Sequence, residues 1–124
     1  MKLIIGGAYQ GKLDFALETF HLNPEQVFTC NGREIDFTKP CIDKLEEFTY
    51  ACVTGKKDPV AYFQDNADKW QDSVLICQDM SCGVVPLGAD MREWRQTTGL
   101  LCQFLSKEAQ SVHRIFCGLE QRLK

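Results

Sequence analysis

Residues 2–17 read KLIIGGAYQGKLDFAL, which predicts a short strand, a glycine-rich loop and the first turns of a helix. The loop matches the phosphate-binding pattern G-x-x-x-x-G-K, with Gly6 first, Gly11 sixth and Lys12 seventh. Glycines let such a loop turn its backbone N–H groups inward around a phosphate, and the following helix adds its positive N-terminal end. We therefore expect Lys12 to reach the β- and γ-phosphates of a nucleotide.

The residue after the lysine departs from this pattern. Leu13 stands where Ser or Thr would offer a hydroxyl to Mg²⁺, and its side chain cannot ligate a metal. This departure weakens the prediction of metal-dependent catalysis more than the prediction of nucleotide binding. The alternative is a glycine-rich turn with a surface lysine. The predicted nucleotide-binding residues are Gly6, Gly7, Ala8, Tyr9, Gln10, Gly11, Lys12 and Leu13.

The composition is that of a globular protein, and the length predicts one domain, residues 1–124. A net charge of −3 gives no basic surface for nucleic acid. The seven cysteines are odd in number and form no C-x-x-C pair, which favours buried free thiols over a disulfide framework or a zinc site. With no signal peptide or membrane-spanning segment evident, we expect a cytoplasmic protein.

Beyond the loop, predicted strands and helices alternate, which is typical of an α/β protein. Strands are predicted at residues 26–30, 73–77 and 111–118, with weaker candidates at 35–37, 40–43 and 119–124. Residues 40–43 could equally lead into a helix. Helices are predicted at 14–20, 45–52, 59–70 and 89–107.

A single acidic residue follows the buried strand predicted at 73–77. Asp79 lies in the predicted loop 78–88, at the carboxyl end of a strand, where open α/β sheets bind their ligands. It is a candidate catalytic residue and a candidate ligand of Mg²⁺. The alternative is an aspartate that accepts hydrogen bonds from nearby backbone N–H groups.

The helix predicted at 89–107 carries Arg92 and Arg95 near its start. Guanidinium groups suit phosphate because they bind two oxygens at once, although arginines more often cover a solvated face. Gly99 within this helix predicts close packing or the approach of a ligand. His21, at a helix end, and His113, in the last core strand, are predicted to be structural or surface residues.

Several stretches together resemble the adenosylcobinamide kinase / adenosylcobinamide-phosphate guanylyltransferase family of cobalamin biosynthesis. IIGGAYQGK, residues 4–12, is similar to the family's opening TGGARSGKS. CQDMSCGVVP, residues 77–86, is similar to the family's SNEVGxGIVP, and it is followed at matching spacing by REWR (92–95), Gly99 and CQ (102–103). FCGLEQRLK, residues 116–124, is similar to the terminal GxPxxLK. The resemblance covers both ends of the chain.

The resemblance implies a P-loop NTPase-like domain in which helices flank a mainly parallel sheet in three α/β/α layers. Family members phosphorylate the aminopropanol hydroxyl of adenosylcobinamide with ATP or GTP, then transfer GMP through a guanylylated histidine, and they form trimers. By position, the phosphate loop would hold the triphosphate and Asp79 would act near Mg²⁺ or the acceptor hydroxyl. The candidates for substrate or phosphate contacts are Arg92, Arg95 and Gln103.

Three departures from the family bear on activity. Leu13 replaces the serine of the loop, and Gln78-Asp79 replaces Asn-Glu. No histidine occurs between Cys30 and Trp70, where the family has its guanylylated residue. The guanylyl-transfer step is therefore predicted to be absent.

Three functions remain in view. The first is an adenosylcobinamide kinase-like enzyme that transfers phosphate from ATP or GTP, with Asp79 and water holding Mg²⁺. The second is a catalytically impaired paralogue that binds a nucleotide or a corrinoid as a regulatory or scaffold protein. The third is a small α/β domain that binds only adventitious phosphate. The expected partners are a corrinoid and further copies of the chain in a trimer, without nucleic acid or membrane.

Overall fold

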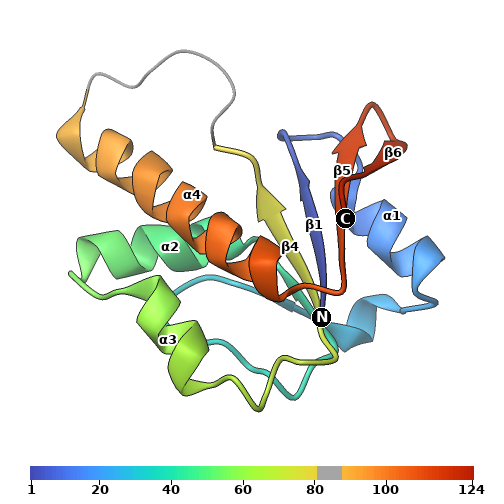
Figure 1. Ribbon diagram of the computed structural model, residues 1–124, viewed down its shortest axis with the longest axis horizontal. Helices are drawn as coiled ribbons and strands as arrows, with labels where there is room; N and C mark the ends of the chain where they lie inside the picture. Colours follow the sequence, from blue (N-terminus) through green and yellow to red (C-terminus); the bar gives the residue numbers. More distant parts are fainter. Residues whose placement is uncertain (81–87) are drawn as a thin grey trace.

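The computed structural model describes residues 1–80 and 88–124, and within them the strands form one sheet in the order β2-β3-β4-β1-β5-β6 (Figure 1). Strands β1 to β5 run parallel, and β6 is antiparallel to β5. The bounds are β1 Lys2–Gly6, β2 Val27–Thr29, β3 Cys41–Asp43, β4 Val74–Gln78, β5 Ser111–Phe116 and β6 Leu119–Arg122. The predicted mainly parallel α/β architecture is confirmed.

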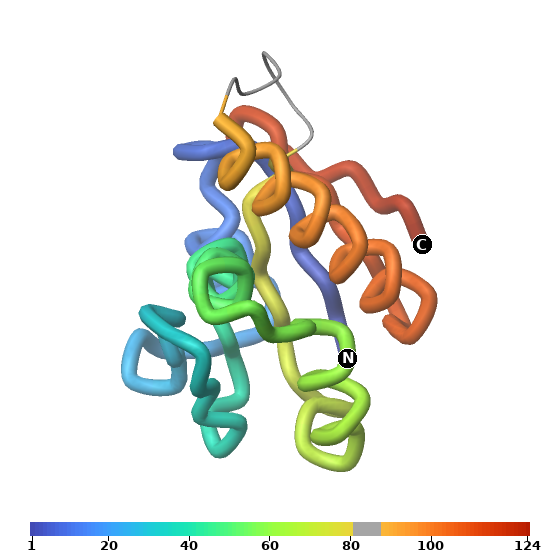
Figure 2. The backbone as a smooth tube through the Cα atoms, turned by 90° about the vertical axis from the view of Figure 1, so that its left-hand side faces the viewer, coloured from blue at the N-terminus to red at the C-terminus, as the bar shows by residue number. Residues whose placement is uncertain are grey.

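Helices cover both faces of the sheet. They are α1 Lys12–Thr19, α2 Leu45–Thr54, α3 Pro59–Asp65 and α4 Ala89–Glu108, with a short 3₁₀ helix, η1, at Pro24–Gln26. Alternate residues of each strand point to opposite faces, so Leu3 packs in the core with α2, α3 and α4, whereas Ile4 packs in the core with α1. Figure 2 looks onto α2, α3 and α4 with the sheet behind them. The arrangement is compatible with three α/β/α layers.

Several predicted elements differ from the observed ones. Residues 35–37 form no strand, because the Asp36 carboxylate accepts from the Thr38 N–H (3.0 Å) and hydroxyl (2.5 Å) and holds a turn. The helix predicted to reach residue 70 ends at Asp65. The Phe63 carbonyl, which would continue that helix, instead accepts from the buried Trp70 indole at 2.8 Å.

Other predictions have mixed outcomes. Of residues 40–43, Cys41–Asp43 form strand β3 rather than the start of a helix, and the tail adds the edge strand β6. The prediction of close packing at Gly99 is wrong, since a Cβ there would meet open space.

Residues 81–87 of the predicted loop 78–88, which include much of the second segment that resembles the family, lie outside the described residues. No helix in the described part of the chain combines the length and apolar character needed to cross a membrane. The buried cysteines are Cys30, Cys41, Cys52 and Cys77.

The end of β1 is packed too closely for any side chain. Gly6 pairs with Gln78 of β4 on one side and with Ile115 of β5 on the other. A Cβ atom at Gly6 would lie 2.6 Å from the Ile115 carbonyl oxygen, which belongs to the backbone of a core strand and cannot rotate away. Glycine is therefore required where the central strand enters the loop.

Gly6→Ala is expected to lower the free energy of unfolding by about 1–3 kcal/mol, because the added methyl overpacks the sheet. Gly7→Ala is the matched control, since a Cβ there meets only the flexible Gln10 side chain at 3.6 Å. Urea unfolding of both variants measures the difference. Equal stabilities would show that the sheet can move to accept the methyl group.

Candidate functional site

The loop between β1 and α1 lies at the carboxyl edge of the central strand, where parallel sheets bind ligands. Tyr9 and Gly11 have left-handed backbone conformations, with φ of 59° and 91°, and Gly11 is the N-cap of α1. The Lys12 ammonium donates to the Gly7 carbonyl at 2.7 Å. The lysine side chain thus folds back over its own loop.

An open cleft of about 550 Å³ lies beside this loop. Six of the eight predicted nucleotide-binding residues line it: Ala8, Tyr9, Gln10, Gly11, Lys12 and Leu13. The remaining wall comes from Asp14, Asp43, Lys44, Glu46, Glu47 and Gln78. The cleft therefore brings the loop together with the ends of β3 and β4 and the start of α2, and its volume is in the range of small-molecule sites.

Asp43 is the carboxylate that sequence reasoning missed. It ends β3, it is 7% exposed, and its Oδ1 accepts from the Lys44 N–H at 2.8 Å. Burial raises the pKa of Asp43, while the Lys44 hydrogen bond and the charge of Lys12 act against that rise. The available signal was an acid directly after two apolar residues, at the end of a short strand.

Glu46 joins three elements beneath the cleft. Its Oε1 accepts from the Gln78 N–H at the end of β4 at 3.0 Å. Its backbone carbonyl accepts from the Trp94 indole of α4 at 2.8 Å. With only 7% of its surface exposed, Glu46 fixes the start of α2 against the end of β4.

Asp79 lies one residue beyond β4, as predicted. Its N–H donates to the Gly6 carbonyl at 2.7 Å, so its backbone is fixed beside the start of the loop. Asp79 also has a further interaction partner. Among the described residues, the cleft wall includes Gln78 but not Asp79. Asp43 and Glu46 are thus the buried carboxylates among the described residues that line the cleft, and the role of Asp79 stays a prediction.

The three candidates on α4 are not among the described residues that line this cleft. Arg92 is exposed, Arg95 is half-buried, and both have interaction partners. Gln103 is exposed further along the helix. Within residues 1–80 and 88–124, none of these side chains lines the cleft that contains Lys12.

The hairpin formed by β5 and β6 contacts the glycine-rich loop between β1 and α1. The Gly118 N–H donates to the Gln10 carbonyl at 3.0 Å, and the Cys117 N–H donates to Gln10 Oε1 at 2.6 Å. Both turn residues have positive φ, 52° at Cys117 and 76° at Gly118. The turn between β5 and β6 therefore helps to set the conformation of the loop, a contact that sequence reasoning did not predict.

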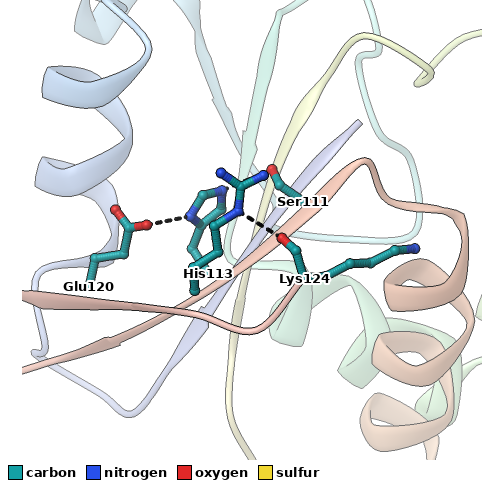
Figure 3. Close-up of polar contacts among 5 residues, drawn as sticks. Ser111, His113, Glu120 and Lys124 are labelled. Atoms are coloured by element: carbon teal, nitrogen blue, oxygen red, sulfur yellow. Dashed lines mark hydrogen bonds and ion pairs between the residues drawn. The ribbon is translucent and has the colours of Figure 1, made fainter.

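His113 on β5 is buried, and Figure 3 shows it beside Glu120. Its Nδ1 lies 3.0 Å from Glu120 Oε1 and its Nε2 lies 2.9 Å from Ser111 Oγ. The rings of Phe15 and Phe20 pack on it at 5.7 and 6.0 Å. These contacts agree with the structural role predicted for this histidine.

A Mg²⁺ ion in the cleft would have few protein ligands. The described residues contain no group of three or more His, Cys, Asp or Glu side chains arranged to hold a metal ion. Mg²⁺ commonly uses one or two carboxylates together with substrate phosphates and water. Asp43, near Lys12 in the cleft, fits the role of one such carboxylate, whereas Leu13 offers no oxygen.

No family model matches the chain, and no curated protein matches it.

Asp43→Asn is expected to raise the melting temperature at neutral pH. The amide keeps an acceptor for the Lys44 N–H but removes a charge whose burial is unfavourable. Because the pKa of Asp43 is raised in the folded state, its charge lowers the free energy of unfolding by the full amount only above that pKa. This destabilisation is lost as the pH falls towards 3.8, the ordinary pKa of an aspartate. Thermal melts across this pH range measure the gain, which should shrink at low pH.

Asp36→Asn is the control for this experiment. Hydrogen bonds from Thr38 lower the pKa of Asp36, so its charge is favourable in the folded state. Its replacement is expected to lower the melting temperature at neutral pH. A lower melting temperature for Asp43→Asn as well would contradict the inferred cost of burying Asp43.

Proposed function

We propose that the chain is a P-loop NTPase-like protein that binds ATP or GTP in the cleft and transfers phosphate to adenosylcobinamide. The observation that carries this proposal is the loop Gly6–Lys12, placed between the central strand and α1 and facing a cleft of nucleotide-compatible volume. The resemblance to adenosylcobinamide kinases supports the choice of acceptor. The lack of a histidine between Cys30 and Trp70 argues against a guanylyl-transfer step.

The proposed triphosphate site uses backbone groups and one lysine. The N–H groups of the loop and of the first turn of α1 would face the phosphate oxygens. Lys12 would exchange its hydrogen bond with the Gly7 carbonyl for one with a β- or γ-phosphate oxygen. This exchange is favourable because the new hydrogen bond joins two charged groups.

Asp43 would hold Mg²⁺ from the part of the cleft wall that the end of β3 forms, together with phosphate oxygens and water. The metal would neutralise charge on the transferring phosphate. Since Leu13 adds no hydroxyl, the ion would have one protein ligand fewer than in the usual loop. A slow kinase is the expected result.

A nucleotide- or corrinoid-binding protein without turnover is the second candidate. The observation that favours it is Leu13, which lines the cleft at the place of the usual metal ligand. The loop and Lys12 would still bind phosphate in such a protein. The two candidate functions therefore share a binding site and differ in whether the site holds Mg²⁺ well enough for phosphate transfer.

Lys12→Ala is expected to weaken ATP or GTP binding about tenfold to a hundredfold, the usual effect of losing a hydrogen bond between charged groups. Isothermal titration with each nucleotide, with and without Mg²⁺, measures the affinity. Lys107→Ala, which removes an exposed lysine at the end of α4, is the matched control and should bind as the wild type does. Binding that is equal in all three proteins would exclude the loop as the triphosphate site.

Leu13→Ser is expected to raise the rate of Mg²⁺-dependent phosphate transfer to cobinamide, since serine restores the metal ligand. Leu13→Ala controls for the loss of the apolar side chain. A kinase assay with purified proteins measures both rates. If the serine variant binds the nucleotide normally without gaining turnover over the alanine variant, the metal ligand was not the missing part and the binding-protein function is favoured.

A further inference from the structure

The outer edge of β6 is open. This strand, Leu119–Arg122, lies at the end of the sheet (Figure 1). All four of its residues are exposed. Within residues 1–80 and 88–124, no strand pairs with its outer side. Proteins usually protect such an edge by proline, by a bulge or by a covering element, because unpaired N–H and C=O groups there attract another strand.

The pairing with β5 shows which backbone groups point outward. The Leu123 N–H donates inward to the Val112 carbonyl at 2.8 Å. Along an antiparallel strand, the backbone N–H and C=O groups of successive residues point alternately toward one neighbouring strand and toward the other. The backbone groups of Gln121 and Leu119 therefore also point toward β5. The N–H and C=O groups of Glu120 and Arg122 therefore face the open edge.

The side chains of this edge also alternate. Glu120 lies opposite Ile115, and Arg122 lies opposite His113, so both project on the face that carries α1. Leu119 and Leu123 project on the other face and are 73% and 52% exposed. Phe116, which lies opposite Leu119, is 61% exposed and extends this apolar surface.

We propose that β6 pairs with β6 of a second copy of this chain, antiparallel and with the two-fold axis at Gln121. In this register Glu120 lies opposite Arg122 of the second copy. The outward-facing N–H and C=O groups of these two residues form hydrogen bonds with each other across the dimer. The same register places Leu119 opposite Leu123 of the second copy. The two sheets become one continuous sheet across the dimer, an assembly that differs from the trimer implied by the family resemblance.

The self-complementary order of charges favours a second copy over an unrelated partner. Under a two-fold axis, every contact between two residues occurs twice, with the roles of the two copies exchanged. Glu120 of each copy therefore lies opposite Arg122 of the other, and both pairs join opposite charges. Glu120 keeps 36% of its side chain exposed beside its contact with His113, so its carboxylate remains accessible to the guanidinium. Backbone bonding, charge and apolar contact thus agree on one register.

Sedimentation velocity over a concentration series tests the proposal. The wild type is expected to form particles of twice the 14.1-kDa chain mass. Arg122→Glu creates two Glu–Glu pairs and Glu120→Arg creates two Arg–Arg pairs, so each variant alone should dimerise at least about tenfold more weakly. Mixed together, the two variants regain opposite charges at both pairs, and native mass spectrometry should detect the heterodimer.

Two further variants keep the test decisive. Arg33→Glu makes the same charge change in the loop between β2 and β3 and should leave the dimer unchanged. Leu119→Asp alters an exposed side chain, places a carboxylate against Leu123 of the second copy and should weaken the dimer even if Glu120→Arg fails to fold. A monomeric or trimeric wild type, or a dimer unaffected by both Arg122→Glu and Leu119→Asp, would overturn the proposal. Since none of these readouts uses nucleotide, the result stands apart from the proposed phosphate site.

Discussion

Strand β1 pairs along its whole length with β4 on one side and β5 on the other, and this parallel pairing organises the molecule. It brings the carboxyl ends of three core strands to one edge of the sheet. The packing is close enough to exclude a side chain at Gly6, where a Cβ atom would meet the Ile115 carbonyl. The last residue of β1 must therefore be a glycine, and the chain continues from it into the loop that ends at Lys12. The geometry of the loop is a consequence of the packing beneath it.

The same edge contains groups whose placement is unfavourable for folding. Asp43 is buried as a carboxylate, with one hydrogen bond from the Lys44 N–H and partial compensation from Lys12. Glu46, equally buried, accepts from the Gln78 N–H, and its backbone carbonyl accepts from the Trp94 indole, so its position is explained by the fold. Within residues 1–80 and 88–124, the Asp43 side chain accepts only from the N–H of its neighbour Lys44. A charge held at such a cost beside a lysine is typical of a site that binds an ion or a polar ligand.

Sequence reasoning succeeded where the signal was local. The apolar run before Gly6 predicted the first strand, and the alternation of strands and helices predicted an α/β protein. The mainly parallel sheet with its flanking helices was implied by the family resemblance. Sequence reasoning failed where distant residues decide the outcome. The end of α3 depends on the Trp70 indole, and the role of Asp43 depends on a strand of three residues, too short for a periodic pattern. The bond between Gln10 and the turn at Cys117 joins positions 107 residues apart, which no local pattern encodes.

The two proposed functions, a kinase and a binding protein without turnover, would be distinguished by two neighbouring side chains. Lys12 already has an acceptor, the Gly7 carbonyl, so its ammonium is ordered over the loop. A phosphate would replace a neutral acceptor with a charged one and would cost little rotamer freedom, which favours binding. Leu13 occupies the position from which the metal is usually held, which disfavours transfer. Binding and transfer depend on different atoms of this loop, so one can persist where the other has been lost.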